Sequence, residues 1–440
     1  MTLNDLTNKK ICFLGLGIEN YALLMFLLQK KLRAEFFVCD ARQNITSPAS
    51  GTLSLIRRGH GVRWKLGKNY DRDLDKYDII FRIAGYPLFN KNIIRAMMAG
   101  VTVSSPAKIF FDLCPSKNII GVTGSKGKGT TASLIFQILK DAGKRVHFGG
   151  NIGVPLFSFF KKIKPDDWVV LELSSFQLED LHLSPHIAVI TNFFPEHLAA
   201  ADPLNPNCHK TLAAYWEAKA VIFTHQNKRD FLVVSEELRE KLRHEKIPSR
   251  VRYFGSLALP TPLVGSHNKR NIAAAQTVAR IVGISRGQIK KSIAAFNGLE
   301  HRLELVAVKD NRRYYNDSFA TTPEASITAL NSFEPGHILL LAGGASKASD
   351  FSSFAGEVKK CVHEIVLLPG KGSREIKIAL NAAKFKHVHT APDMKQAVAA
   401  AERFSQPGDV ILLAPACASF GIFKNYKDRG EQFKRAVLRS

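Results

Sequence analysis

The stretch NIIGVTGSKGKGTTASLIFQILKDAG, from Asn118 to Gly143, decides the fold. An apolar run is followed by a glycine-rich loop and then by a run with helical spacing. Glycines let backbone N–H groups converge on phosphates, and the N-terminus of the following helix favours anions. Lys128 can then reach the β and γ oxygens of a nucleotide. The stretch therefore predicts a strand, a phosphate loop and a helix that together bind a nucleoside triphosphate.

The loop departs from the general G-x-x-x-x-G-K-[ST] pattern in two places. Gly121 lies one position early, and Gly129 follows Lys128 where a hydroxyl normally contacts magnesium. Thr130 or Thr131 can supply that hydroxyl instead. The residues expected to contact the nucleotide are Thr123, Gly124, Ser125, Lys126, Gly127, Lys128, Gly129, Thr130 and Thr131.

Upstream of the loop, residues 11–17, 34–40 and 78–85 are expected to be strands, with a helix over 21–32. Gly15 and Gly17 lie where the first strand would turn into the helix, and Asp40 ends the next strand, as in a dinucleotide-binding fingerprint. Asn20 replaces the third glycine of that fingerprint. Three interpretations stay open: a nicotinamide site, a contact with another nucleotide or pyrophosphate, and a tight turn in an open sheet.

Apolar runs continue downstream and alternate with helical stretches, so the sequence predicts mainly parallel sheets covered by helices on both faces. The expected strands are 146–150, 166–175 and 186–193, then 337–344, 364–370, 387–390 and 409–416. Such a long chain exceeds one ordinary core. We expect an α/β protein of three domains: a Rossmann-like domain over 1–108, a central P-loop ATPase domain over 109–305, and a second Rossmann-like domain over 306–440.

Composition excludes several classes. Hydrophobic residues make up 45% of the 440, no apolar run is long enough for a bilayer, and the first residues lack a signal-peptide layout, so we expect a cytoplasmic protein without a membrane partner. The six cysteines are scattered, which indicates buried thiols. The formal charge of +24 attracts polyanions. Its basic residues form only short groups, so nucleic acid is not the expected partner, although a nucleic-acid-binding NTPase is kept as an alternative.

Further motifs lie along the chain in an order that resembles one family. The T-G-x-x-G-K loop is similar to that of Mur ligases and folylpolyglutamate synthases. Two segments, ELSSFQLE (172–179) and APACAS (414–419), resemble signatures of the D-glutamate-adding branch of the Mur ligase family. Between them stand matching short motifs at 150–153, 267–271, 301–302 and 316–318. The resemblance runs from about residue 10 to 438.

This resemblance implies a uridine-nucleotide-binding domain, an ATPase domain and a C-terminal domain that closes over ATP and admits the amino acid. It implies that ATP, with Mg²⁺, phosphorylates the carboxylate of UDP-N-acetylmuramoyl-L-alanine, and that the amine of D-glutamate attacks the acyl phosphate. Charge builds on phosphoryl oxygens during such a transfer, so cations supply most of the acceleration. The enzyme is expected to be a monomer.

The resemblance also assigns roles to single residues. Glu172, His197 and Lys219 resemble magnesium ligands, with Lys219 carbamylated, and Thr130 adds its hydroxyl. The catalytic group would be Lys128, His197 and Lys219. Further ATP contacts are implied at Asn268, Asn271, Arg302 and Asp317. The implied substrate contacts are Gly17, Asp40 and Gly85 for the uridine diphosphate, Asn151, Ser174 and Gln177 for the nucleotide sugar, and Lys347, Ser419 and Tyr426 for D-glutamate.

Departures from the family pattern fall at functional places. Phe319 stands where the family usually has lysine, and Gly421 where an aspartate usually follows. Ile83 and Ala84 replace a Ser-Pro turn, and Glu196 precedes His197 in an altered segment. Another amide ligase, which adds a different amino acid or extends folate, is therefore the first alternative. The nucleic-acid-binding NTPase and a nicotinamide oxidoreductase follow.

Overall fold

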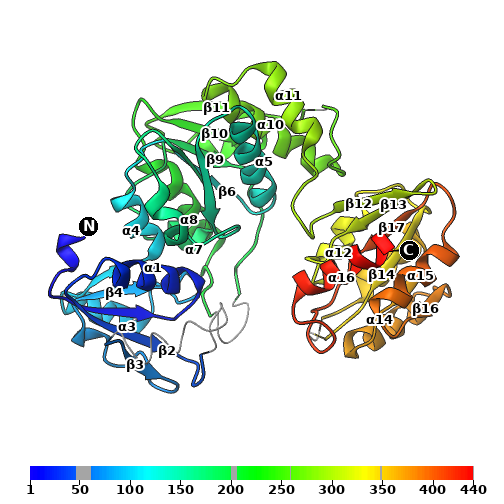
Figure 1. Cartoon of the computed structure of the whole chain (residues 1–440), viewed down its shortest axis with the longest axis horizontal. Helices are drawn as coiled ribbons and strands as arrows, with labels where there is room; N and C mark the ends of the chain where they lie inside the picture. The colour runs from blue at the N-terminus through cyan, green and yellow to red at the C-terminus, as the bar shows by residue number, and fades with distance from the viewer. Residues whose placement is uncertain (46–60, 200–205, 258, 347–348, 440) are drawn as a thin grey trace. The chain divides into compact units, whose positions relative to one another are not determined.

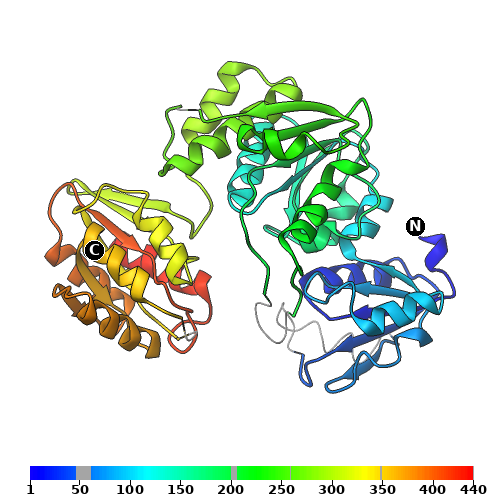
Figure 2. The ribbon, with the colours of Figure 1, turned by 180° about the vertical axis from the view of Figure 1, so that it is seen from behind.

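The computed structural model describes residues 1–45, 61–199, 206–257, 259–346 and 349–439. The chain divides into two compact units, one formed by residues 1–257 and 270–289, the other by 258–269 and 290–440. Figures 1 and 2 show the ribbon from opposite sides. Among the described residues, no helix is long and apolar enough to cross a membrane.

The N-terminal part of the first unit is a parallel sheet of five strands in the order β3-β2-β1-β4-β5. Helix α1 packs on one face through Leu23 and Phe26, and α3 covers the other through Ile93 and Ala96. The elements are η1 (Asn4–Leu6), β1 (Lys10–Leu14), α1 (Ile18–Gln29), β2 (Glu35–Asp40), β3 (Arg63–Leu66), η2 (Leu74–Lys76), β4 (Ile79–Arg82), α3 (Lys91–Met98) and β5 (Thr102–Ser104).

The first unit also contains a parallel six-stranded sheet in the order β11-β10-β9-β6-β8-β7. The phosphate-loop strand β6 is therefore central. The elements are α4 (Pro106–Leu113), β6 (Ile119–Thr123), α5 (Lys128–Asp141), β7 (Val146–Gly150), α6 (Leu156–Phe159), η3 (Phe160–Lys162), β8 (Trp168–Glu172), α7 (Ser175–Leu178), β9 (Ile187–Ile190), α8 (Leu212–Thr224), β10 (Phe231–Ser235), η4 (Glu236–Leu238), α9 (Arg239–Leu242) and β11 (Arg250–Phe254). Helices α10 (Ser266–Ile281) and α11 (Arg286–Ala295) are each divided between the two units, with residues 270–281 and 286–289 in the first.

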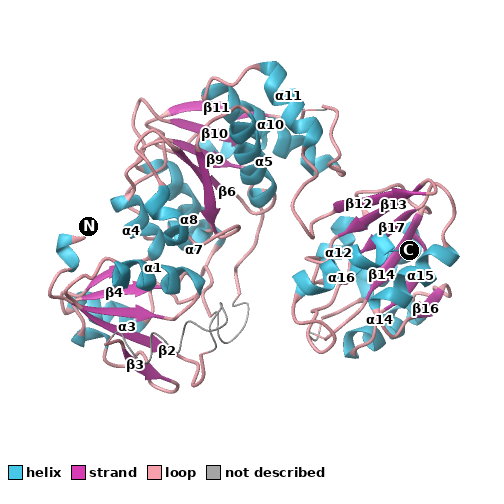
Figure 3. Ribbon diagram, viewed as in Figure 1, coloured by secondary structure: helices cyan, strands magenta, loops and turns pink. Residues whose placement is uncertain are grey.

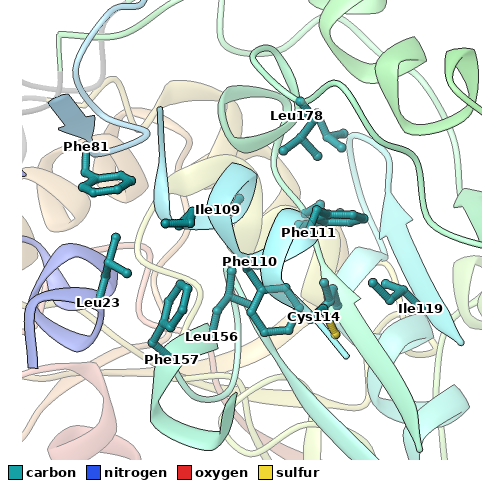
Figure 4. Packing of buried hydrophobic residues seen from close by; sticks show 14 of the residues in the cluster. Leu23, Phe81, Ile109, Phe110, Phe111, Cys114, Ile119, Leu156, Phe157 and Leu178 are labelled. Atoms are coloured by element: carbon teal, nitrogen blue, oxygen red, sulfur yellow. The ribbon is translucent and has the colours of Figure 1, made fainter. Parts of the chain in front are cut away.

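One hydrophobic cluster joins the two sheets of the first unit, and Figure 4 shows its centre. The ring of Phe110 in α4 packs against the ring of Phe157 in α6, with the two centroids 6.0 Å apart. Both residues belong to the same cluster as the apolar side chains of the N-terminal sheet. Phe26 of α1 contacts Phe157 at 5.0 Å. Packed aromatic rings contribute large buried areas. The five-stranded sheet and the six-stranded sheet that carries the phosphate loop therefore share one hydrophobic core, which fixes them to each other.

The second unit carries a six-stranded sheet in the order β12-β13-β17-β14-β15-β16, in which only the β12–β13 pair is antiparallel. Phe354 and Leu380 belong to the cluster on one face, and Met394 and Phe433 to the cluster on the other. The elements are β12 (Glu304–Lys309), β13 (Arg312–Asn316), α12 (Pro323–Leu330), β14 (Ile338–Ala342), α13 (Ser352–Cys361), β15 (Val362–Leu367), α14 (Lys371–Ala382), β16 (Val388–Thr390), α15 (Met394–Phe404), β17 (Val410–Leu413) and α16 (Tyr426–Arg439).

The predicted α/β class with mainly parallel sheets is confirmed, and the colouring of Figure 3 shows helices against each sheet. Every strand expected from the sequence is present; β7 has the expected bounds, and each of the others is shorter than its expected range. The first strand, for example, ends at Leu14, because Gly15 takes a left-handed conformation at φ 79°. Five cysteines are buried, and Cys208 is partly exposed. The boundaries at 108 and 305 stay a prediction.

Candidate active site

The phosphate loop joins the end of β6 to the start of α5, as the sequence predicts. Gly124 and Gly127 have φ angles of 144° and 81°, which L side chains rarely adopt. A Cβ atom on Gly127 would collide with the side-chain oxygen of Asn271, and one on Gly124 would collide with the hydroxyl of Thr191. Both glycines are therefore required by conformation and by space. The loop passes close to Thr191 and Asn271. The first N–H groups of α5, which have no partner within the helix, lie at this turn.

The segment that follows β9 holds this loop from one side. The hydroxyl of Thr191 donates to the carbonyl of Lys126 at 2.7 Å, and the N–H of Lys126 donates to the side-chain oxygen of Asn192 at 2.8 Å. The hydroxyl of Ser125 donates to the carbonyl of Phe194 and accepts from its N–H, both at 2.9 Å. The loop is thus tied by backbone and side-chain bonds. A loop held in this way binds phosphate without first losing much conformational freedom.

Two lysines from different helices meet inside the loop. The ammonium of Lys128 donates to the carbonyl oxygens of Gly124 and Ser125, and that of Lys219 donates to Gly124, all at 2.9 Å. Lys219 lies in α8 with only 1% of its surface exposed. Burial lowers its pKa well below the usual value, and the neighbouring charge of Lys128 lowers it further. Lys219 is therefore a buried amine at the loop, not an exposed helix lysine.

Glu172 ends β8 beside the loop. One of its oxygens accepts from the side chain of Asn151 at 3.2 Å, whereas the other is buried without a hydrogen-bond partner. A buried carboxylate oxygen of this kind is rare unless a cation or donor completes it. The charge of Glu172 acts on Lys219. The pair predicted from the sequence, Glu172 and Lys219, is therefore brought together.

His197 follows the loop-holding segment with a left-handed backbone, φ 59°. Burial lowers the pKa of its imidazole, and the nearby charges of Lys128 and Lys219 lower it as well, against the opposing effect of Glu196. A neutral imidazole is the form that binds metal ions. Glu196 forms an ion pair with Lys126 at 2.7 Å. Burial would raise the pKa of Glu196, but the hydrogen bond and charge of Lys126 hold it below the usual value.

A group of side chains that no sequence motif predicts surrounds His197. His209 is buried and stacks on Phe176, with centroids 4.7 Å apart and planes at 9°, and it contacts the hydroxyl of Ser175 at 2.9 Å. Its backbone N–H donates to the carbonyl of His197. Tyr215 of α8 contacts both imidazole rings. These residues hold His197 in place, and no motif marks them, because their partners are distant in sequence.

The expected uridine-diphosphate positions lie at the carboxyl ends of N-terminal strands. Gly17 is the N-cap of α1. Asp40 accepts the N–H of Leu16 at 2.7 Å and both nitrogens of the Arg42 fork, at 2.8 and 2.7 Å. Burial would raise the pKa of Asp40, yet these donors hold it below the usual value. Arg42 was not predicted, and it neutralises an acid that would repel a diphosphate.

Gly85 lies in a half-buried turn after β4, and a fully buried arginine anchors this turn. The guanidinium of Arg82 donates to the carbonyl of Tyr86 at 2.9 Å and to Glu179 at 2.7 Å, and it lies 3.6 Å from Asp180. The turn is thereby tied to the end of α7. The sequence does not mark Arg82 as a buried anchor either, because it lies within a run that predicts an apolar strand.

Ser174 and Gln177 form a capping box at the start of α7. The hydroxyl of Ser174 accepts the N–H of Gln177 at 3.2 Å, and the side-chain oxygen of Gln177 accepts the N–H of Ser174 at 3.0 Å. These bonds fix both side chains next to Glu172. The structure therefore gives the two residues a local structural role in addition to the predicted contact with a sugar.

Asn271 lies in the first unit against the loop, where its side-chain oxygen accepts from Thr131 at 3.3 Å. Asn268 is assigned to the second unit and donates to the carbonyl of Val264 at 2.7 Å. Both side chains are almost completely buried. The predicted adenine contacts therefore have defined positions, each within its own unit.

In the second unit, Arg302 lies over the ring of Phe319, with 3.9 Å between its central carbon and the ring centroid. Asp317 accepts the N–H of Leu303 at 3.3 Å, and burial raises its pKa to about 7. Tyr426 begins α16 and contacts Phe319 edge to face at 5.1 Å. The unit therefore brings together three of the predicted residues, Arg302, Asp317 and Tyr426.

Ser419 is buried at the end of the APACAS segment, and Lys347 lies outside the described residues. Arg429 of α16 is fully buried and joins the segment at Ser318 to the APACAS segment. It donates to the hydroxyl and carbonyl of Ser318, at 3.0 and 2.8 Å, and to the carbonyl of Cys417 at 3.1 Å. Burial lowers its pKa to about 10. No sequence signal distinguishes this arginine from the many others.

Comparisons with known proteins place this geometry in a class. Residues 122–256 match the Mur ligase middle domain, and residues 301–417 match the Mur ligase, glutamate ligase domain. The structure resembles UDP-N-acetylmuramate-alanine ligase MurC from Thermotoga maritima, with a TM-score of 0.58 at 18% identity over 98% of this chain and 99% of that one. It also resembles MurF ligase from the same organism, solved in complex with ADP, with a TM-score of 0.56 at 17% identity over 100% and 97%. The fold is thus that of the Mur ligases.

A curated relative narrows the class. The UDP-N-acetylmuramoylalanine--D-glutamate ligase of Symbiobacterium thermophilum is 35% identical over 98% of this chain and 98% of its own length. The chain belongs to the family of these D-glutamate ligases. The family resemblance predicted from ELSSFQLE, APACAS and the phosphate loop is confirmed.

Proposed function

We propose that this protein joins D-glutamate to UDP-N-acetylmuramoyl-L-alanine, with ATP converting the acceptor carboxylate into an acyl phosphate. One observation carries the chemical part of the proposal: Lys128 and the buried Lys219 converge on the carbonyl of Gly124 within a phosphate loop. The substrates are inferred from the relatives' names, together with the retained ELSSFQLE and APACAS segments.

The residues of the loop account for the first chemical step. Their N–H groups and the ammonium of Lys128 surround the place that a triphosphate would take, and the charge of Lys128 stabilises the negative charge that grows on the leaving ADP. Lys128 donates to the carbonyls of Gly124 and Ser125, and these contacts direct its ammonium at the loop.

The second step needs a neutral amine on D-glutamate and a stabilised tetrahedral carbon. We assign Asn151, Ser174 and Gln177 to the nucleotide sugar. The capping box and the contact with Glu172 fix these side chains beside the end of β8. Gly17, Asp40 and Gly85 are assigned to the diphosphate side. Ser419, Tyr426 and Lys347 are assigned to the amino acid, and Asn268, Asn271, Arg302 and Asp317 to the nucleotide.

We also propose a magnesium site built from Glu172, His197, the hydroxyl of Thr130 and Lys219 as a carbamate. The residues present fit such a site, because Glu172 has a buried oxygen without a partner and His197 is biased towards its neutral form. A carbamate would turn the buried amine of Lys219 into an oxygen ligand, and Mg²⁺ prefers oxygen. The bound ion would neutralise phosphate charge and orient the γ-phosphate.

A ligation assay tests the proposal. The protein is incubated with UDP-N-acetylmuramoyl-L-alanine, ATP, Mg²⁺ and D-glutamate, and the product is identified by mass spectrometry. Parallel reactions replace D-glutamate by L-alanine or meso-diaminopimelate, or supply a folate acceptor with L-glutamate. Product formed only with D-glutamate is expected; phosphate release that depends on another amino acid or on nucleic acid would overturn the assignment.

The variant Lys128→Ala tests the loop in the same assay. Loss of a charge that stabilises a phosphoryl transition state commonly costs about 10²- to 10³-fold in kcat. Lys140→Ala changes an exposed lysine of the same helix and serves as the control. Equal turnover of Lys128→Ala and Lys140→Ala would show that the nucleotide reacts elsewhere.

A further inference from the structure

The ring of Phe319 is an exposed aromatic side chain that lies in an unusual setting. It is 41% exposed, its centroid lies 3.9 Å from the central carbon of the Arg302 guanidinium, and Tyr426 packs against it edge to face, with planes at 87°. Exposed phenylalanine is common on protein surfaces and needs no explanation by itself. The stacking of a guanidinium on it at van der Waals distance gives this ring a specific partner.

The backbone around Arg302 is fixed by the segment that carries Phe319. His301 and Leu303, on either side of Arg302, have left-handed φ angles of 64° and 44°. The N–H of Phe319 donates to the carbonyl of His301 at 3.0 Å. The carboxylate of Asp317 accepts the N–H of Leu303 at 3.3 Å. Strained backbone persists where surrounding bonds enforce it, and here those bonds hold the residue between the two strained ones.

A buried polar pair extends this support. The ring of His301, with 4% of the residue exposed, contacts the side-chain nitrogen of Asn316 at 2.9 Å. Asn316 ends β13, so the sheet positions the segment 316–319 directly. The segment 316–319, which begins at the end of β13, therefore both supports the main chain at Arg302 and provides the ring beneath its side chain.

We propose that Phe319 is a positioning residue, which holds the Arg302 guanidinium in the orientation that contacts a phosphate of ATP. This inference rests on the proposed function, where Arg302 is assigned to the nucleotide. Stacking on a ring engages the face of a guanidinium, whereas arginine binds phosphate oxygens in pairs through the N–H groups at its edge, so the two contacts are compatible. A free arginine would lose rotamer freedom on binding, and a stacked one has already lost it.

The contact with Arg302 gives a physical reason for phenylalanine at position 319, where the family usually has lysine. A lysine at position 319 would place a second positive charge beside Arg302 and could not support its face. Phenylalanine does the reverse, because its ring attracts the cation and adds no charge. In this chain we infer that position 319 serves the arginine instead of meeting a ligand with a charge of its own.

Two readouts on purified full-length variants test the inference: the Kd for ATP with Mg²⁺, measured by calorimetry, and the KM for ATP in the ligation assay. Phe319→Leu is expected to weaken both about 3- to 30-fold, the range that a partly desolvated cation–π contact gives, with kcat changed less than twofold. Phe319→Tyr keeps an aromatic face and should restore values within twofold of wild type.

A double-mutant cycle separates positioning from a general structural role. In the Arg302→Gln background, Phe319→Leu should cause no further weakening, because the group that it positions is gone. The control is Phe404→Leu, which removes another ring of the second unit that lies near an arginine, with Arg403 at 5.6 Å. The ATP Kd of this control should match wild type.

Several outcomes would overturn the inference. These are an ATP Kd of Phe319→Leu within twofold of wild type, failure of Phe319→Tyr to restore binding, or an equal effect of Phe319→Leu with and without Arg302. Failure of the proposed function has a different signature, namely a wild-type protein that binds ATP but forms no D-glutamate product. The calorimetric titration decides on Phe319 in either case, since it needs no turnover.

Discussion

The ammonium groups of Lys128 and Lys219 both donate to the carbonyl oxygen of Gly124, each at 2.9 Å. Burial is the main cause that lowers the pKa of Lys219, and the like charge of Lys128 lowers it further. The lowered pKa increases the fraction of neutral amine near pH 7. A neutral amine is the form that reacts with carbon dioxide to give a carbamate.

The first prediction follows from this pair. With carbon-13-labelled bicarbonate, NMR of the wild-type protein should show a carbamate signal, and ligation activity should rise with bicarbonate. The signal should weaken as the pH falls, because protonation of Lys219 removes the reactive amine. Lys219→Gln should abolish both effects, whereas Lys140→Gln, at an exposed position of α5, should change neither. A carbamate signal that persists in Lys219→Gln would place the modification elsewhere.

A second prediction compares two glycines that flank the same helix. Gly127 is the N-cap of α5 at φ 81°, and Gly143 follows the end of the helix at φ 74°. An added Cβ meets nothing within 4 Å at Gly143, but collides with Asn271 at Gly127. Both alanine variants should lose about 1–2 kcal/mol of stability from the left-handed backbone.

Only Gly127→Ala should also weaken ATP binding, since relief of the collision requires the loop or Asn271 to move. Thermal unfolding and ATP titration of the two variants separate these contributions. Equal ATP affinities for Gly127→Ala and Gly143→Ala would show that the loop conformation does not decide nucleotide binding.

The sequence was sufficient for the phosphate loop and the strands next to it, because apolar runs and glycines are local signals. Six strands had no prediction, among them β3 and β11 at the edges of their sheets. Their sequences, RWKL and RVRYF, alternate charged and apolar residues, as edge strands often do. The apolar run FLVVS of β10, in contrast, is a local strand signal.

The contacts of the candidate site are still harder to predict from the sequence, because they join residues that are far apart in the chain. The burial of Lys219 depends on a carbonyl 95 residues away in the chain. Likewise, Arg82 meets Glu179 across 97 residues, and Arg429 meets Ser318 across 111. Sequence spacing contains no information on such contacts, and in a chain with 62 basic residues nothing distinguishes the few that are buried.

A third prediction concerns the ion pair between the turn at Gly85 and helix α7. Removing one partner of a buried pair leaves the other charge unpaired, at a cost of about 3–5 kcal/mol. Arg82→Met should therefore lower the Tm strongly, and Glu179→Gln in the same chain should restore part of the loss. As the control, Arg63→Met breaks an exposed pair with Glu35 of 2.8 Å and should change stability by less than about 0.5 kcal/mol. Similar Tm shifts for Arg82→Met and Arg63→Met would contradict the structural role of the buried pair.

The last prediction is a pH dependence set by Glu19 in the first turn of α1. One oxygen of Glu19 accepts the N–H of Leu156 at 3.1 Å, the other is buried without a partner, and burial raises the pKa to about 7 from 4.5. Between these two pH values the folded state holds a proton that the unfolded state has released. Stability therefore falls as the pH rises from 4.5 to 7, and the full cost is present above pH 7.

Glu19→Gln mimics the protonated acid, since its amide offers the same acceptor and adds a donor. We expect this variant to be about 1–3 kcal/mol more stable than wild type at pH 8 and nearly equal to it at pH 4.5, on the basis of roughly 1.4 kcal/mol per pKa unit. Chemical denaturation at several pH values measures the difference. Glu240→Gln, at an exposed position of the same unit, should show no such trend. A Glu19→Gln advantage that is the same at both pH values would mean that the carboxylate is solvated and that α1 packs against Leu156 without any cost in charge burial.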